Sequence, residues 1–137
     1  MSMGNPQMIF VNLAVRDLQA SRTFFAALGY SFNPQFSDDN AACMVISDSI
    51  FVMLLVEPFF QTFTNKPLTD ARKQTEVITC LSAVSRQAVD ELLDKALAAG
   101  GSEPMPARDY GFMYQRGFAD LDGHLWEIAH MDGEPGQ

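Results

Sequence analysis

The chain has 137 residues, of which 47% are hydrophobic and 19% charged, a composition that excludes global disorder. A chain of this length favours one domain with its own core. Seventeen acidic and nine basic residues give a net charge of -8, which argues against nucleic acid or an anionic membrane surface as a partner. The longest apolar run, residues 50–56, is too short to cross a bilayer, and residues 1–7 lack the features of a signal peptide.

Both cysteines, Cys43 and Cys80, lie within apolar runs. This position favours buried free thiols over a disulfide framework. Together with the lack of signal-peptide features, it leads us to expect a cytoplasmic protein.

The first part of the chain predicts the order β-α-β-β-β. Residues 8–15 alternate at period two, as in a strand, and the face that carries Phe10 and Asn12 is mixed enough to line a cavity. Asp17 is a typical N-cap for the helix that follows, and Gly29 is a typical residue after its end. Three strands are predicted at residues 30–36, 42–46 and 50–56.

The same order returns after a connector. Residues 57–74 are polar and contain two prolines, so we expect a connector with one helical turn that covers a pocket or a partner. A strand at residues 76–83 precedes a helix capped by Ser85 and ended by Gly100, 71 residues after Gly29. Strands are predicted at residues 105–108, 111–118 and 124–131. We therefore expect a single domain over residues 1–137, with modules at about 8–56 and 75–131.

Three segments in this order resemble the vicinal oxygen chelate superfamily, which includes glyoxalase I, extradiol dioxygenases, and fosfomycin and bleomycin resistance proteins. They are the strand, cap and helix of residues 10–30, the Ala-Ala-Gly-Gly of residues 98–101, and the Asp-Leu-Asp-Gly-His-Leu-Trp-Glu of residues 120–127. The resemblance implies an α+β fold in which two β-α-β-β-β modules form half-barrel mixed sheets around a cavity. It also implies a homodimer and a small-molecule ligand.

Metal-dependent members of this superfamily hold one divalent ion with His and Glu side chains on inward strand positions. Glu127 matches the ligand of the closing strand, whereas Phe10 and Met53 occupy two other ligand positions and are unsuitable for such an ion. The fourth position falls on Glu76 or Ile78, because the strand register is open by two residues. If a metal binds, Glu127 and Glu76 are its ligands. We expect no cofactor, because a catalytic zinc site has three protein ligands.

Aromatic and polar residues predict a ligand pocket. Alternation places Tyr110, Phe112 and Tyr114 on one face of a strand, where their rings suit a pocket wall or ordinary sheet packing. Arg108 and Arg116 either bind a carboxylate or phosphate or form surface salt bridges. The predicted catalytic residue is Glu127, and the predicted pocket residues are Phe10, Asn12, Met53, Glu76, Tyr110, Phe112, Tyr114 and Arg116. Of these, Asn12 is the candidate buried amide, and Glu76 has the alternative role of a solvated residue before a strand.

Two functions remain open on this pattern. The first is a lyase or isomerase acting on a small metabolite with neighbouring oxygens, with Glu127 as its main carboxylate. An extradiol iron site would need two histidines beside the carboxylate, and His124 and His130 are expected to point away from Glu127. The alternative is a metal-free protein that binds and sequesters a small molecule, as bleomycin resistance proteins do, and an acidic chain suits a cationic ligand. A third interpretation is a structural protein whose own side chains fill the cavity.

Overall fold

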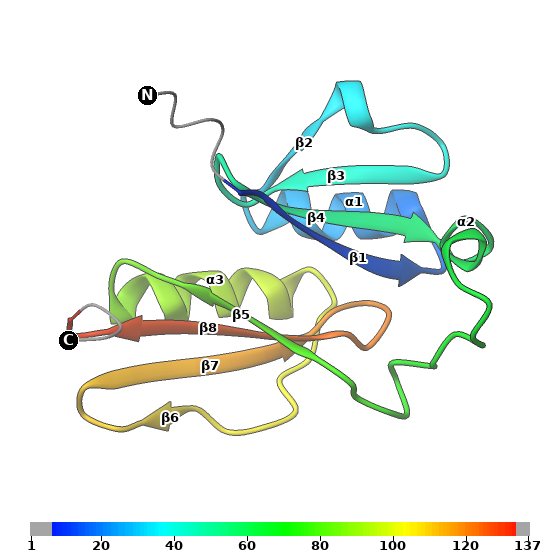
Figure 1. The fold of residues 1–137 in the computed structure, drawn as a ribbon. Coiled ribbons are helices and arrows are strands. Elements are labelled where there is room, and N and C mark those ends of the chain that lie inside the picture. The colour runs from blue at the N-terminus through cyan, green and yellow to red at the C-terminus, as the bar shows by residue number, and fades with distance from the viewer. Residues whose placement is uncertain (1–6, 134–137) are drawn as a thin grey trace. The chain divides into compact units, whose positions relative to one another are not determined.

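The computed structural model describes residues 7–133, and the chain divides into two compact units, Met1–Leu68 and Thr69–Gln137 (Figure 1). Each unit contains a four-stranded mixed sheet with one long helix on one face. Within residues 7–133, no helix is long and apolar enough to span a membrane.

The first unit follows the predicted element order. Its strands are β1 (Ile9–Val15), β2 (Ser31–Asn33), β3 (Ala41–Val45) and β4 (Ile50–Val56), and they lie in the order β1-β4-β3-β2. Strands β1 and β4 pair in parallel, and the other neighbours pair antiparallel. The parallel pair is possible because α1 (Leu18–Ala27) and the hairpin strands intervene in the sequence.

The ends of α1 match the residues predicted for them. The Ala20 N–H donates to Asp17 Oδ1 at 3.0 Å, and Gly29 follows the helix at a φ of 107°. The buried side of the helix carries Phe24 and Phe25, and α1 packs against β3 and β4. The core of this unit therefore lies between α1 and one face of the sheet.

The second unit repeats this arrangement. Its strands are β5 (Ile78–Ser82), β6 (Arg108–Asp109), β7 (Met113–Ala119) and β8 (Leu125–Met131), in the order β5-β8-β7-β6. Helix α3 (Arg86–Ala98) begins where Ser85 Oγ accepts the Ala88 N–H at 2.9 Å. The helix packs on β7 and β8, where Phe118 and Trp126 are 1% exposed. The predicted repeat of β-α-β-β-β modules is confirmed, because the two sheets share one strand order.

The segments between these elements contain short helices. Residues Pro34–Phe36 form the 3-10 helix η1, and the connector contains α2 (Glu57–Phe60) and the 3-10 helix η2 (Gln61–Phe63). The strand predicted to run to residue 36 ends at Asn33, whose Oδ1 accepts the Gln35 N–H at 2.9 Å and so starts a turn. The strand predicted at residues 105–108 shrinks to Arg108–Asp109, because Pro104 and Pro106 have no N–H for a sheet ladder.

Only one of the two cysteines is buried as predicted. Cys43 on β3 is buried, and its burial raises the pKa of its thiol. Cys80 is exposed, which contradicts the prediction. It lies on β5, an edge strand of its sheet, and pairs with Glu127 rather than with an apolar neighbour.

Candidate functional site

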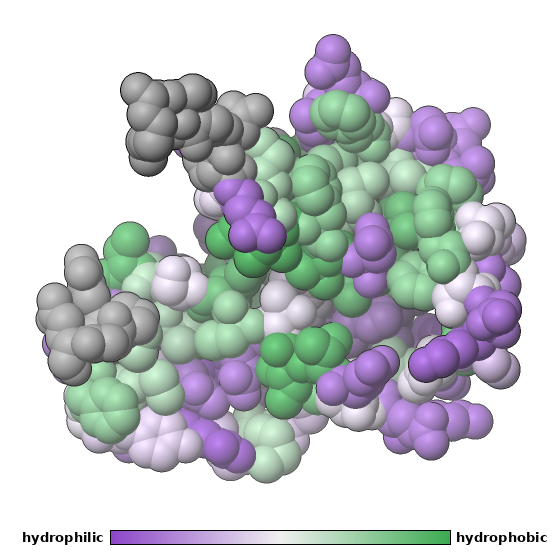
Figure 2. All heavy atoms as spheres, viewed as in Figure 1, coloured by the Kyte–Doolittle hydropathy of each residue, from purple (hydrophilic) through white to green (hydrophobic). Residues whose placement is uncertain are grey.

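The face of each sheet that is turned away from its helix is the candidate binding surface. In the second unit, Trp126 and Ile128 are buried beneath α3, so the intervening Glu127 points to the opposite face. His130 shares the side of Trp126, as predicted, and its Nδ1 lies 3.0 Å from the Ala83 carbonyl oxygen. On the first sheet the corresponding face carries many apolar residues at the surface (Figure 2).

A cavity of about 490 Å³ lies on this face of the first unit. Phe36 from η1 and two rings of the connector, Phe59 and Phe63, form its apolar wall, and the centroids of the last two lie 5.1 Å apart in an edge-to-face pair. Asn12 on β1 and Met53 on β4 are paired residues that form part of the lining. The structure therefore brings together two of the predicted pocket residues.

Asp38 is the ionisable residue in the lining of this first cavity. Its Oδ1 accepts the N–H groups of Asn40 at 2.8 Å and Ala41 at 3.0 Å, which fixes the carboxylate in the loop before β3. Within residues 7–133, Asp38 Oδ2 forms no hydrogen bond or ion pair, so it is available to a ligand.

A second cavity, of about 320 Å³, lies in the second unit beside Glu127. Gln115 Nε2 donates to Glu127 Oε2 at 3.2 Å, across β7 and β8. Gly117 pairs directly with Glu127, and a Cβ at Gly117 would lie 3.6 Å from Glu127 Cγ. A Cβ at Gly117 would also lie 3.1 Å from the Trp126 carbonyl oxygen, so glycine lets the two strands approach closely beside the carboxylate.

Two further polar residues extend this row across the sheet. Arg108 on β6 pairs with Gln115, and Cys80 on β5 pairs with Glu127. Burial raises the pKa of the Cys80 thiol, and the negative charge of Glu127 raises it further. Arg108, Gln115, Glu127 and Cys80 thus form a polar row on one face of the second sheet.

The structure corrects the prediction that Asn12 is buried, and it places the ring of Phe10 against Phe51. Asn12 is exposed rather than buried, because the face of β1 that carries it is not covered by α1. Phe10 is 53% exposed and stacks on Phe51, with the ring centroids 5.0 Å apart. Phe10 does not line the cavity of about 490 Å³.

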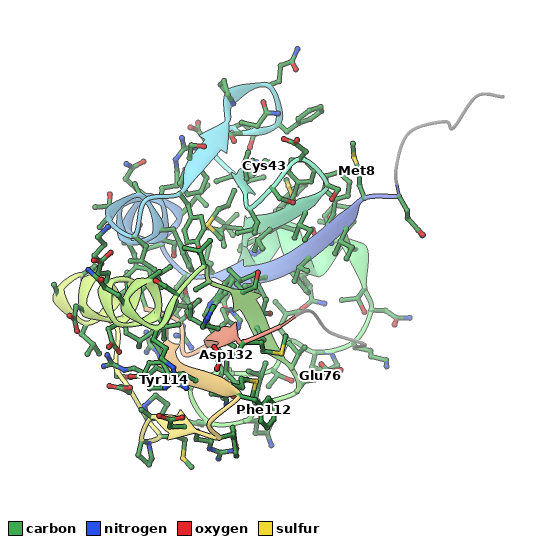
Figure 3. The ribbon with its side chains drawn as sticks, turned by 90° about the vertical axis from the view of Figure 1, so that its left-hand side faces the viewer. Met8, Cys43, Glu76, Phe112, Tyr114 and Asp132 are labelled. Carbon is green, nitrogen blue, oxygen red and sulfur yellow. The ribbon has the colours of Figure 1, made fainter. Side chains whose placement is uncertain are left out.

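The aromatic segment of residues 110–116 does not form one continuous face. Tyr110 and Phe112 lie in the turn between β6 and β7, where Gly111 has a φ of 84° and ends the alternation. Tyr114 lies on the side of the second sheet toward α3, and Phe112 lies away from that helix (Figure 3). The Tyr114 hydroxyl donates to Asp90 Oδ1 at 2.7 Å, so the three rings do not share one face. Tyr114 and Arg116, two of the predicted pocket residues, line a separate cavity of about 500 Å³.

Arg116 shares the α3 side with Tyr114 and serves in an ion-pair cluster. Its guanidinium donates to both oxygens of Glu103, at 2.9 Å and 2.8 Å, and to Asp90 at 3.0 Å. These bonds raise the pKa of Arg116 and lower the pKa of Glu103. The alternative of a salt bridge therefore describes Arg116, and its guanidinium points away from the Glu127 face.

The strand pairing of β5 places Ile78, rather than Glu76, at the fourth metal position of the superfamily. In the second sheet, Ile78 pairs with Leu125 and Cys80 pairs with Glu127. In the first sheet, Phe10 pairs with Phe51 and Asn12 pairs with Met53. Ile78 is therefore the counterpart of Phe10. Glu76 precedes β5, is exposed, and does not line the cavity beside Glu127. Its labelled side chain can be followed in Figure 3.

The sequence also contained signals for site residues that the predictions missed. Gln115 and Gly117 share a face with Glu127 by simple alternation once β7 is aligned against β8. The rings of Phe36, Phe59 and Phe63 lie in short helices, where neither strand nor long-helix periodicity applies. For Phe59 and Phe63 the signal is only the density of aromatic residues in an otherwise polar connector.

Comparison with known proteins agrees with this fold. A family model described as bleomycin resistance protein-like N-terminal matches residues 7–47. A hypothetical protein from S. aureus is 30% identical over 93% of this chain and 95% of its own, with a TM-score of 0.77. No curated protein matches the sequence.

Two named structures share the fold at lower identity. A glyoxalase-related enzyme from Fulvimarina pelagi is 24% identical over 90% of this chain and 87% of its own, with a TM-score of 0.77. A glyoxalase/bleomycin resistance protein/dioxygenase family enzyme from Burkholderia phytofirmans PsJN is 15% identical over 92% of this chain and 99% of its own, also with a TM-score of 0.77. The chain belongs to the vicinal oxygen chelate superfamily.

The metal positions of the vicinal oxygen chelate superfamily carry unsuitable donors here. They fall on Phe10, Met53, Ile78 and Glu127, of which only Glu127 offers an oxygen ligand. Within residues 7–133, no group of three His, Cys, Asp or Glu residues lies close enough to hold a metal ion. The donor set therefore does not fit the divalent ion of the metal-dependent members.

Proposed function

We propose that this protein is a metal-independent small-molecule-binding protein of the bleomycin-resistance type, with an aromatic or apolar organic cation as its ligand. The observation that carries this proposal is the cavity of about 490 Å³ in the first unit, whose lining combines three phenyl rings with the single carboxylate of Asp38. Open cavities also disfavour a purely structural protein filled by its own side chains.

The lining chemistry favours a cation. A cation over a phenyl ring is attracted by the negative face of the π system, and the effect is larger where water is displaced. Asp38 Oδ2 offers an unpaired carboxylate oxygen at the same cavity, and no Lys or Arg lines it. The net charge of -8 adds long-range attraction for a positive ligand.

Three matched probes test this proposal: benzyltrimethylammonium, benzyl alcohol and benzoate. They share one ring and differ in charge. In heteronuclear NMR titrations, we expect benzyltrimethylammonium to shift the Met53 methyl signal and the amides of residues 35–38 and 59–63. Benzyl alcohol should bind more weakly, and benzoate should cause no shift. Equal binding of benzoate would refute the assignment of a cationic ligand.

Two variants and a control locate the binding. Asp38→Asn retains the Oδ1 acceptor of the loop but loses the charge, and Phe63→Ala removes one ring of the wall. Both should weaken benzyltrimethylammonium binding at least five-fold. Phe112→Ala removes a ring that is 65% exposed in the second unit, compared with 68% for Phe63, and should have no effect.

A lyase or isomerase that uses Glu127 is the second candidate. It is favoured by one observation: the Glu127 carboxylate is held by Gln115 in the lining of the cavity of about 320 Å³, as a group that transfers protons would be. Such an enzyme would exchange a C–H proton next to a carbonyl of its bound ligand in deuterated water. Glu127→Gln would abolish that exchange without loss of ligand binding in the first unit.

A further inference from the structure

Three charged residues line the second cavity: Arg108, Arg116 and Glu127. The guanidinium of Arg116 is already paired with Glu103 and Asp90, which leaves Arg108 and Glu127 as two charges of opposite sign. We propose that this cavity binds a small zwitterion of the α-amino-acid type, with Arg108 holding the carboxylate and Glu127 holding the ammonium group. This site lies within the second unit, so the proposal stands independently of the ligand assigned to the first unit.

Both charges lack an ionic partner within the described part of the chain. Arg108 has one contact, to the Tyr110 hydroxyl at the long distance of 3.5 Å. Glu127 accepts a hydrogen bond from the neutral amide of Gln115. By contrast, Arg86 at the start of α3 forms a bidentate pair with Asp109, and Arg116 on β7 forms one with Glu103.

The spacing of the two charges suits one small ligand between them. Arg108 and Glu127 lie on β6 and β8, with β7 between them, and neighbouring strands are about 4.8 Å apart. Their backbones are therefore separated by roughly 10 Å or more along one face of the sheet. No Arg108–Glu127 ion pair forms at 4.0 Å or less within residues 7–133, which leaves room for a molecule that contacts both.

Gln115 and Gly117 shape the space between the charges. Gln115 Nε2 fixes the Glu127 carboxylate, and the amide oxygen of Gln115 remains able to accept a bond from an ammonium group. Gly117, which pairs with Glu127 and lines the cavity, has no side chain that could occupy the space between the two charges. A guanidinium is the side chain that best binds a carboxylate with two parallel hydrogen bonds, which assigns the ligand's carboxylate to Arg108.

The remaining wall of the cavity is apolar. Ile78 and Leu125 are paired residues at one end, and Met105 lies in the segment before β6. The volume of about 320 Å³ is at the lower end of the range for ligand pockets, about 300–1,000 Å³. A free amino acid with an unbranched or branched aliphatic side chain matches this size and polarity better than a peptide or a nucleotide.

Isothermal titration calorimetry with three leucine probes tests the proposal. L-leucine carries both charges, N-acetyl-L-leucine lacks the ammonium group, and L-leucinamide lacks the carboxylate. We expect L-leucine to bind and each derivative to bind at least ten-fold more weakly. Failure of L-leucine, L-methionine and L-valine to bind the wild-type protein would overturn the proposal, as would equal affinity for the derivatives.

Charge-removing variants identify the residues. Arg108→Gln should abolish the discrimination between L-leucine and L-leucinamide, and Glu127→Gln should abolish that between L-leucine and N-acetyl-L-leucine. Lys73→Gln and Glu76→Gln remove one exposed charge each outside the cavity and should leave both ratios unchanged. These ratios compare ligands on one protein, so a partly unfolded variant changes them little.

The test also separates this site from the cavity of the first unit. L-leucine should shift the NMR signals of Ile78, Gly117 and Leu125 but not those of Phe36 and Phe63. Phe63→Ala should leave L-leucine binding intact. A leucine response confined to the first unit would overturn the zwitterion site, whereas loss of benzyltrimethylammonium binding alone would overturn only the function proposed for the first cavity.

Discussion

At the scale of single residues, Arg116 organises the α3 side of the second sheet. Its side chain is 15% exposed and bonds to Glu103 and Asp90, and Asp90 also accepts the Tyr114 hydroxyl. These contacts join β7, the first half of α3 and the segment after the helix. The cluster therefore contributes to stability rather than to ligand binding.

Removing Arg116 should destabilise the protein. Arg116→Met keeps much of the side-chain volume but leaves two carboxylates without their cation, which should lower the free energy of unfolding by about 1–3 kcal/mol, between the values for exposed and buried pairs. Urea denaturation measures the change. Lys73→Met removes an exposed positive charge and should change the value by less than about 0.5 kcal/mol. An equal effect of both variants would contradict the role of the cluster.

The same cluster should make stability depend on pH. The Arg116 hydrogen bonds lower the pKa of Glu103, so its contribution to stability is fully present above its unfolded pKa of about 4.3 and is lost as the pH falls through its folded pKa. Between about pH 5 and pH 3, wild-type stability should therefore fall more steeply than that of Glu103→Gln. Parallel profiles from denaturation at several pH values would rule out this contribution.

The residue-level predictions succeeded or failed for physical reasons. Asp17 and Ser85 were predictable, because a capping side chain acts on N–H groups only two or three residues away. Tyr110, Phe112 and Tyr114 do not share a face as predicted, because residues 110–112 lie in the turn before β7, where Gly111 has a positive φ and strand alternation does not apply.

At the scale of elements, the turn between β7 and β8 is held against the connector. A Cβ at Gly123 would lie 2.8 Å from both the N and Cα atoms of Arg72, and Gly123 has a φ of 91°. The guanidinium of Arg72 donates to the Leu121 carbonyl oxygen at 3.3 Å. The close approach of two backbones fixes the chain just before β5.

Gly123→Ala should be more harmful than the same change at Gly29. Both glycines have positive φ, but a Cβ at Gly29 meets no atom within 4 Å. Gly29→Ala should cost about 1 kcal/mol of backbone strain, and Gly123→Ala should cost about 2–3 kcal/mol because residues 71–72 must also move. Thermal and urea unfolding of the two variants measure the difference. Equal losses of unfolding free energy in the two variants would show that residues 71–72 move without an energetic cost.

Element order was easier to predict from the sequence than element length. The two modules follow from hydrophobic alternation and from the glycines that end α1 and α3, since these signals are local. The length of β6 depends on Pro104 and Pro106, which cannot donate to a neighbouring strand. The rings of the first cavity were missed because η1, α2 and η2 place them through single turns that have no sequence period.

At the scale of the whole molecule, we expect no stoichiometric metal. Three of the four superfamily metal positions carry Phe, Met and Ile, which are not ligands for a borderline or hard ion. Elemental analysis after incubation with zinc, nickel, manganese or anaerobic ferrous iron should find no ion retained after gel filtration. One tightly held ion per chain, lost in Glu127→Gln, would refute the metal-independent function and restore metal-dependent lyase chemistry.

We further propose that the protein is a homodimer. Strand β1 is an edge strand, and Met8, Ile9 and Phe10 at its start are 45%, 53% and 53% exposed. Such a cluster on an unpaired edge is typical of an interface. Light scattering after gel filtration should give twice the mass of one chain. Phe10→Asp should give the monomer, and Phe112→Asp, at a ring 65% exposed elsewhere, should not.

The arrangement of the two cysteines provides a chemical handle on the zwitterion site. Cys43 is buried and Cys80 is exposed, directly opposite Glu127 on the neighbouring strand. A maleimide fluorophore or a nitroxide spin label would therefore attach to the wild-type chain at one defined position, without mutagenesis. Because the pKa of Cys80 is raised, labelling should be slow at neutral pH and become faster as the pH rises and the thiolate forms. Attached there, the probe would report ligand occupancy through its emission or its mobility.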